Sequence, residues 1–285
     1  MDLPSVILAD NRYGKSRVRM IRVVRSGDRH ELQDVEVKIA FEGGFEAAHT
    51  EGDNSRVLPT DTMKNTVYAL AHRASGVEEI EGLALRLAEH FVENNEEARQ
   101  VNVEICEHPW ARINIGGKPH PYSFTSGTDE KRIVRVKASV GSVTMTAGIE
   151  ALRVLKTTGS AFEGFKRDEL TTLKDASDRI LATSIDASWI YSAPEVGCRA
   201  VWRGVKQHIL ETFAEHDSQS VQQTLYAIGR SVLHNFDEVT EISLSLPNNH
   251  CILVDLSPFG MENRNEIYLP IDEPHGLIEA TLRKI

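Results

Sequence analysis

Hydrophobic and polar positions alternate along much of the chain, and the period changes from two to about four and back. Residues 33–41 are apolar at every second position, a pattern typical of a strand with one buried face. The apolar residues are Val35, Val37, Ile39 and Phe41. A second strand is predicted at 17–24, joined to the first by the turn residues Ser26, Gly27 and Asp28. The chain therefore opens with an expected strand pair.

Two helices are expected next. Thr60 and Asp61 favour the N-cap of a helix that continues through Met63, Val67 and Leu70. Residues 77–94 carry apolar side chains at helical spacing, with glutamates on the opposite side. Strands are then predicted at 100–106, 110–115 and 131–140.

The second half repeats this order more faintly. Residues 180–191 and 197–203 look extended, helices are expected at about 204–215 and at 218–235, and strands at 241–246 and 251–256. Strands, paired helices and strands in each half predict an α+β fold of antiparallel sheets with helices on one face. We expect one domain over 1–145 and another over 146–285. Their open sheet edges favour closure into a barrel between subunits.

Composition and charge narrow the classes of function. The 285 residues have a formal net charge of −10, which argues against nucleic acid as the main partner. No apolar run could span a membrane, and the first residues lack the pattern of a signal peptide. Cys106, Cys198 and Cys251 are far apart and form no disulfide framework, and the chain ends without the peroxisomal Ser-Lys-Leu. A cytoplasmic protein is expected.

The sequence contains no recognisable cofactor motif. The eleven histidines show no metal-ligand spacing, and neither GxGxxG nor a phosphate-binding loop occurs. We therefore expect neither a metal nor a nucleotide cofactor.

Five polar segments could carry chemistry, although each also has an ordinary structural explanation. Arg12 to Lys15 could be a solvated basic turn, and Pro59 to Thr66 a plain helix start or an anion site. Between Lys156 and Arg179, the phenylalanines could pack in the core, and Arg179 could pair with Asp175 at i,i+4 on a helix. Ser220 to Thr224 could be a first helical turn, and Leu246 to His250 a turn after a strand.

Taken together and in this order, these segments resemble urate oxidase, and the resemblance spans nearly the whole chain. The motifs that carry it are Asp53-Asn54-Ser55, Pro59-Thr60-Asp61-Thr62-Met63-Lys64-Asn65-Thr66, Gly117-Lys118-Pro119-His120, Val154-Leu155-Lys156-Thr157-Thr158, Phe162-Glu163-Gly164-Phe165, Ser220-Val221-Gln222 and Leu246-Pro247-Asn248-Asn249-His250.

The resemblance implies the tunnelling fold (T-fold), with two tandem halves that assemble as a homotetramer, a dimer of dimers. It implies oxidation of urate by O2, without metal or organic cofactor, to 5-hydroxyisourate and hydrogen peroxide at a site shared between subunits. Another T-fold enzyme acting on a purine or pterin, and a purine-binding oligomer without activity, are the alternatives.

The resemblance also implies a role for each site residue. Arg179 would contact one edge of the purine with two hydrogen bonds, and Gln222 and the Val221 backbone N–H would hold the opposite edge. Phe162 would stack on the ring. The remaining roles are Thr60 and the Asp61 N–H contacting the ligand from the neighbouring subunit, Asn248 holding oxygen or water, and Lys15, Thr60 and His250 relaying protons.

Two positions depart from the family pattern. Leu170 and Cys251 stand where aromatic residues are usual, and both are interpreted as packing changes.

The implied chemistry needs a base rather than a redox metal, because a second deprotonation makes urate rich enough in electrons to reduce oxygen directly. Lys15 could draw a proton from Thr60 for that purpose.

Overall fold

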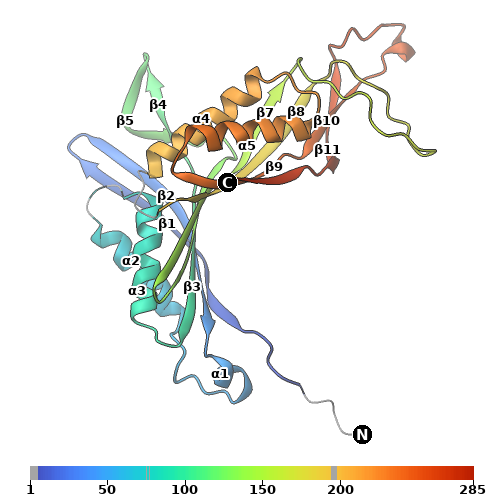
Figure 1. Cartoon of the computed structure of the whole chain (residues 1–285). Helices are drawn as coiled ribbons and strands as arrows, with labels where there is room; N and C mark the ends of the chain where they lie inside the picture. Colours follow the sequence, from blue (N-terminus) through green and yellow to red (C-terminus); the bar gives the residue numbers. More distant parts are fainter. Residues whose placement is uncertain (1–5, 75, 77, 194–197) are drawn as a thin grey trace. The chain divides into compact units, whose positions relative to one another are not determined.

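The computed structural model describes residues 6–74, 76, 78–193 and 198–285 (Figure 1). The chain divides into two units, Met1–Ala147 with Ala193–Cys198, and Gly148–Ser192 with Arg199–Ile285. Strand β7 (Ser142–Lys156) contains the main boundary between them. None of the helices in the described ranges is long and apolar enough to cross a membrane.

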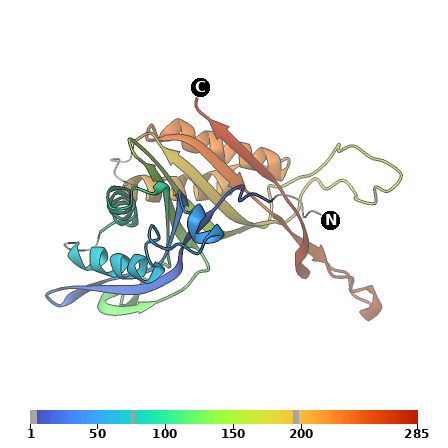
Figure 2. The same ribbon diagram turned by 90° about the horizontal axis from the view of Figure 1, so that it is seen from below.

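The first unit is an antiparallel sheet with helices on one face (Figure 2). Its strands follow the order β1-β2-β3-β6 and continue into β7, and α3 packs on β3 and β6. The elements are β1 (Arg12–Ser26), β2 (Arg29–Gly43), α1 (Glu46–Thr50), α2 (Thr60–Arg73), α3 (Ile80–Glu93), β3 (Ala98–Glu107), β4 (Ala111–Ile115), β5 (Lys118–Thr125) and β6 (Lys131–Ser139).

The core of this unit consists largely of the apolar residues whose spacing predicted a strand and a helix. The alternating apolar residues of β2, from Val35 to Phe41, are at most 1% exposed. On α3, Ile80, Leu83, Leu87 and Phe91 are at most 2% exposed. The predicted strand 33–41 is thus confirmed, and the helix predicted over 77–94 is confirmed for residues 80–93. Residues 78, 79 and 94 lie outside the helix, and residue 77 lies outside the described residues.

The second unit has the same kind of layering, with α4 and α5 on one face of the strands (Figure 1). Strand β8 pairs with β9, and β9 pairs with β12. Strand β8 also pairs with β10, where Ala182 lies opposite Asn249, and β10 pairs with β11. The elements are β8 (Leu181–Tyr191), α4 (Cys198–Glu215), α5 (Val221–Asn235), β9 (Val239–Ser245), β10 (Asn248–Leu253), the 3-10 turn η1 (Ser257–Phe259), β11 (Tyr268–Gly276) and β12 (Glu279–Arg283).

The strand predicted over 197–203 is wrong. Residue 197 lies outside the described residues, and residues 198–203 form the first turns of α4. The buried residues of this helix recur every four positions, at Val201, Val205, Ile209 and Phe213. The segment 197–203 is too short to show that period, so its apolar residues were also compatible with a strand.

Several strands were not predicted at all. Strands β5 and β11 each contain two prolines, which lower the expectation of a strand. Strand β7 ends in Glu-Ala-Leu-Arg-Val-Leu-Lys, a run of good helix formers. Pairing with neighbouring strands overrides these local preferences.

A buried ion pair connects α3 to the sheet of the first unit. Arg132 of β6 donates two hydrogen bonds to Glu81 in the first turn of α3, at 2.8 and 2.7 Å. The side chains of Arg132 and Glu81 are only 5% and 2% exposed. Glu107 of β3 also lies 3.4 Å from Arg132. Each charge is therefore kept in the interior by its partner.

We expect Glu81→Gln to destabilise the protein by about 3–5 kcal/mol, because it leaves the Arg132 charge buried with too little compensation. Urea unfolding measures this cost. Glu104→Gln is the matched control, since it breaks the half-exposed pair with Arg135 on the same sheet and should cost less than about 1 kcal/mol. Equal costs for the two variants would contradict the role given to burial.

Candidate active site

Lys15 lies within β1, where it pairs with Ile39 of β2, so the interpretation of Arg12 to Lys15 as a solvated turn is wrong. Gly14 makes the pairing possible: a Cβ atom there would lie 1.9 Å from the Ile39 carbonyl oxygen. The register shifts directly after Lys15, and Arg17 has a φ of 58°. Lys15 therefore sits at a bulge rather than in a regular strand.

The N-terminus of α2 has no side-chain cap. The N-cap is Pro59, which makes no capping hydrogen bond, so the prediction of Thr60 and Asp61 as the cap is wrong. The Asp61 carboxylate instead accepts hydrogen bonds from Lys64 and Asn65 of the next turn. The first N–H groups of a helix lack partners within it, which makes the N-terminus of α2 a suitable place for an anion.

Tyr13 connects β1 to the start of α2. The Leu58 N–H donates to the Tyr13 hydroxyl at 3.0 Å, and the Tyr13 ring packs edge-on against Phe41 and Phe45. The hydrogen bond from Lys64 is the largest cause of the lowered pKa of Asp61, and the charge of Lys15 adds to it. Lys15, Thr60 and Asp61 thus belong to one region of the first unit.

In the second unit, a backbone bridge joins two segments that are far apart in sequence. The Ala161 N–H donates to the Ser218 carbonyl at 2.7 Å, and the Ser218 N–H donates to the Gly159 carbonyl at 3.0 Å. Ser218 is completely buried, and its hydroxyl accepts from Thr224 of α5 at 2.7 Å. The loop after β7 is thereby fixed to the start of α5.

The first turn of α5 has a variant of the capping box, in which the side chain of Gln223 reaches back to the residue before the N-cap. The Ser220 hydroxyl accepts from the Gln223 N–H at 3.1 Å, and the Gln223 side chain accepts from the Gln219 N–H at 2.8 Å. Val221 is buried, while Gln222 is exposed. The cap satisfies the Gln223 N–H. The N–H groups of Val221 and Gln222 also lie in the first turn, where a helix provides no internal hydrogen-bond acceptor for them.

Arg179 lies next to the ring of Phe162. Its backbone N–H donates to the Ser160 carbonyl at 2.8 Å, and its Cζ is 5.3 Å from the Phe162 centroid. The Phe165 ring stacks on that of Phe162 at 5.0 Å. Burial lowers the pKa of Arg179, and its buried Nε has no hydrogen-bond partner among the described residues.

The alternative in which Arg179 pairs with Asp175 on a helix is wrong. The segment between β7 and β8 is not helical, and Asp175 pairs with Arg167 at 2.9 Å. Asp178 is also engaged elsewhere, because it accepts from the Thr158 hydroxyl at 2.7 Å. A guanidinium that is half-buried and has an unpartnered nitrogen is suited to an anionic ligand.

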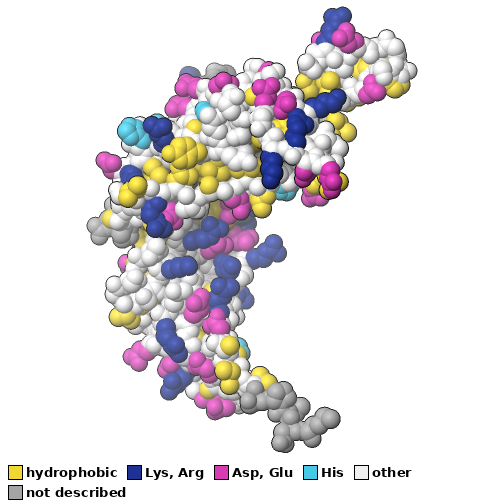
Figure 3. Space-filling model, turned by 45° about the vertical axis from the view of Figure 1, so that its right-hand side comes forward, with side chains coloured by type: hydrophobic (Ala, Val, Ile, Leu, Met, Phe, Trp, Pro, Cys, Tyr) yellow, Lys and Arg dark blue, Asp and Glu magenta, His cyan; other side chains and the backbone are white. Residues whose placement is uncertain are grey.

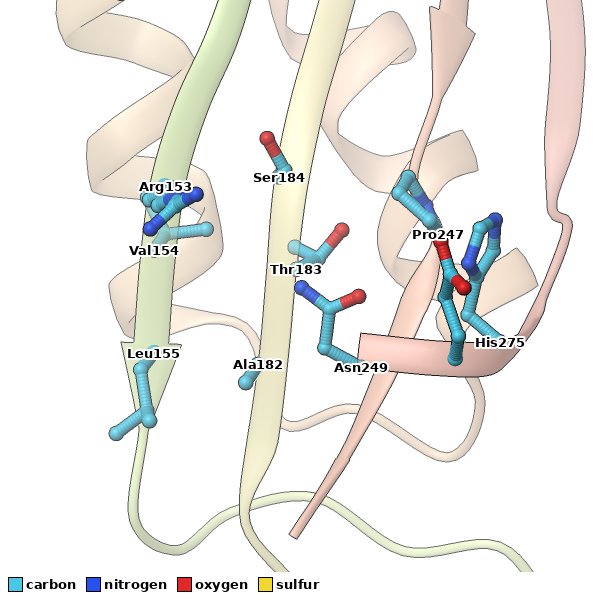
Figure 4. Close-up of a pocket in the computed structure, with 10 residues that line it drawn as sticks. Arg153, Val154, Leu155, Ala182, Thr183, Ser184, Pro247, Asn249 and His275 are labelled. Atoms are coloured by element: carbon cyan, nitrogen blue, oxygen red, sulfur yellow. The ribbon is translucent and has the colours of Figure 1, made fainter. Parts of the chain in front are cut away.

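Asn248 and His250 lie at the start of β10, beside the first residues of β8, which follow Arg179 in the chain. Asn248 is half-buried and His250 is exposed. Between them, Asn249 reaches toward β8 and lines a cavity of about 500 Å³ (Figure 4). The cavity lining does not include the predicted residues Asn248 and His250; it consists of Arg153, Val154, Leu155, Ala182, Thr183, Ser184, Pro247, Asn249, Glu273 and His275.

The family model of uricase matches residues 11–137 and 145–279. The chain belongs to the uricase family. It is 45% identical to the uricase of Arthrobacter globiformis over 98% of this chain and 90% of that protein. The uricase of Danio rerio is 37% identical over 95% and 92% of the two chains. The crystal structure of the Arthrobacter globiformis uricase matches with a TM-score of 0.93, covering 98% of this chain and 96% of that chain. These matches confirm the predicted T-fold class.

In this member of the uricase family, the residues named from the sequence fall into two groups. Lys15, Thr60 and Asp61 lie in the first unit, and the others lie in the second. Across the described ranges, no group of three or more His, Cys, Asp or Glu side chains is placed to hold a metal ion. Leu170 is 82% exposed, and Cys251 is half-exposed at its position in β10.

Sequence reasoning missed the residues that hold these groups in place. They are Tyr13, Asp178, Ser218 and Thr224. The spacing of Ser220 and Gln223 is a recognisable capping-box signal. No such signal marks Tyr13 or Ser218, because their partners lie far away in the sequence.

Asp178 provides a prediction about pH. Hydrogen bonds from the Thr158 hydroxyl and then the Ser160 N–H lower the pKa of Asp178. A carboxyl whose pKa is lower in the folded state stabilises that state above its unfolded pKa, about 3.9, and loses this effect as pH falls through the folded value. We therefore expect Asp178→Asn to be less stable than the wild type at neutral pH. Urea midpoints should converge below about pH 4, whereas a gap independent of pH would refute this account.

Proposed function

We propose that this chain oxidises urate with oxygen and water to 5-hydroxyisourate and hydrogen peroxide. Family membership and the match to the Arthrobacter globiformis uricase support this activity. The observation that carries it is the arrangement of Arg179, whose buried Nε has no partner in the described part of the chain. Arg179 adjoins the ring of Phe162. Its backbone N–H bonds to Ser160, whose two neighbours in the chain bond to Ser218 just before α5.

These groups match the chemistry of a flat purine anion. The planar guanidinium of Arg179 binds one edge of the ring through two parallel hydrogen bonds. The Gln222 amide and the Val221 N–H hold the opposite edge, at the positive end of α5. Phe162 stacks on the heterocycle. The net charge of −10 does not attract urate to the protein, so these local groups must supply the affinity.

The neighbouring subunit completes the site in this proposal. Its Thr60 and Asp61 would present the N–H groups at the start of α2 to the same ligand, in a homotetramer built as a dimer of dimers. The outer edge of β1, which pairs with no other strand among the described residues, supports association, because an open sheet edge can pair with another chain and exposed apolar side chains add area to such a contact. Ile21 on edge strand β1 is 58% exposed, Phe259 69% and Leu269 55%, and hydrophobic atoms reach the surface in Figure 3.

The chemical step needs proton removal and electron transfer to oxygen. Lys15 draws a proton from Thr60, which takes one from bound urate, and His250 passes protons onward. Asn248 holds oxygen and then water above the ring. Urate gives two electrons to O2, which takes up two protons as hydrogen peroxide, and the oxygen of water becomes the new hydroxyl.

Arg179→Lys should raise KM for urate about 10- to 100-fold, because lysine keeps the charge but cannot make two parallel hydrogen bonds. Steady-state rates of urate loss measure this change. Arg29→Lys is the control, since Arg29 pairs with Glu31 at the exposed turn between β1 and β2 and should leave KM unchanged. Equal effects of the two substitutions would count against the assigned contact.

Lys15→Met and Thr60→Ala should each lower kcat about 10²- to 10⁴-fold while urate still binds. An anaerobic urate titration followed by admission of oxygen separates these steps, with peroxide as the readout. Lys38→Met, at an exposed position of β2, is the control. A wild-type protein that binds urate and forms no peroxide would support a purine-binding oligomer without activity instead.

A further inference from the structure

Lys156 is the last residue of β7, and no role has yet been found for it although its segment is one of those that resemble the family. Its side chain is half-buried, and its Nζ donates to the backbone carbonyl of His216. The His216 N–H closes the last turn of α4 by donating to Thr212 at 3.0 Å. Lys156 thus places a positive charge at the C-terminus of α4, the negative end of the helix dipole.

The carbonyl that Lys156 binds begins the short connection between α4 and α5. After His216 come Asp217 and the buried Ser218, which makes the bridge to Gly159 and Ala161. Asp217 and Asp178 both interact electrostatically with Lys156. Asp178 precedes Arg179 and accepts a hydrogen bond from the Ser160 N–H at 3.3 Å. The Lys156 ammonium group therefore bonds to the connection that leads into α5 and lies near the negative charge of Asp178, the residue before Arg179.

We propose that Lys156 is a positioning residue for urate recognition, which rests on the function proposed above. By binding the His216 carbonyl, Lys156 fixes the α4–α5 connection and thereby the Val221 and Gln222 N–H groups relative to Arg179. Without the Lys156 ammonium group, the His216 carbonyl loses its hydrogen-bond donor. The carboxylates of Asp178 and Asp217 lose a nearby positive charge. The two sides of the urate site then no longer hold the spacing that binds the ring.

The chain contains a matched control at the other end of α5. Lys284 Nζ donates to the Phe236 carbonyl at 2.8 Å, just beyond the last residue of that helix. This is the same kind of bond, an ammonium on a carbonyl after a helix C-terminus. It stabilises the end of α5 remote from Val221 and Gln222. Loss of either lysine should therefore lower stability, but only loss of Lys156 should affect urate.

The test compares Lys156→Met and Lys284→Met in the full chain, by thermal unfolding, steady-state kinetics and anaerobic urate titration. We expect both variants to lose stability. Lys156→Met should raise KM and the Kd of urate about 10- to 100-fold, with a smaller effect on kcat, because binding groups are displaced. Lys284→Met should keep the wild-type KM. Lys156→Arg, which retains the charge, should recover part of the affinity.

The outcomes are separable. An unchanged KM in Lys156→Met, or an equal rise in both methionine variants, would overturn the positioning role. If Lys156→Met does not fold, Lys156→Gln takes its place with the same expected rise in KM, because the glutamine side chain is shorter than that of lysine and has no charge to compensate Asp178 and Asp217. Absence of urate turnover in the wild-type chain would refute the proposed function itself, before any variant is compared.

Discussion

The backbone bridge between Ser160 and Ser218 is the constraint on which the proposed binding half depends. Phe162 and Arg179 belong to the connection between β7 and β8, whereas Gln222 belongs to the first turn of α5, far away in sequence. Ser160 accepts from the Arg179 N–H, and its neighbours Gly159 and Ala161 bond to Ser218, so one short stretch aligns all three. Ser218 is fully buried and must be small and polar, since its hydroxyl bonds to Thr224 and unmade buried hydrogen bonds cost about 1–3 kcal/mol each.

An acidic protein can bind an anion when the attraction is local. The helices α2 and α5 each begin with N–H groups that face no helical partner, and the positive end of the helix dipole lies there. The Asp61 carboxylate has the same sign of charge as an anionic ligand, but it accepts hydrogen bonds from Lys64 and Asn65. Similarly, Asp175 and Asp178 bond to Arg167 and Thr158, so the carboxylates around Arg179 are already engaged.

The sequence alone predicted the elements whose apolar residues recur at a regular spacing. The buried faces of β2 and α3 follow from residues such as Val37 and Leu87, because local spacing determines which side is buried. Strand β7 could not be predicted in this way, since its helix-forming residues become a strand only by pairing with the neighbouring strands β6 and β8. For the site, the family resemblance named residues such as Arg179. It could not reveal that Tyr13 holds Leu58, because that contact joins distant parts of the chain.

A sheet protein that binds a flat polar ring meets a general difficulty. In the interior of a sheet, each backbone N–H and carbonyl is already paired, and only side chains remain to bind a ligand. Unpaired backbone groups occur where regular structure begins, ends or is interrupted. The proposed site residues lie at such places, which explains why turns and helix starts, rather than strand centres, carry the family's motifs. These places are the β1 bulge at Lys15, the first turn of α2 at Thr60 and Asp61, the residues before β8 at Arg179, the first turn of α5 at Val221 and Gln222, and the start of β10 at Asn248.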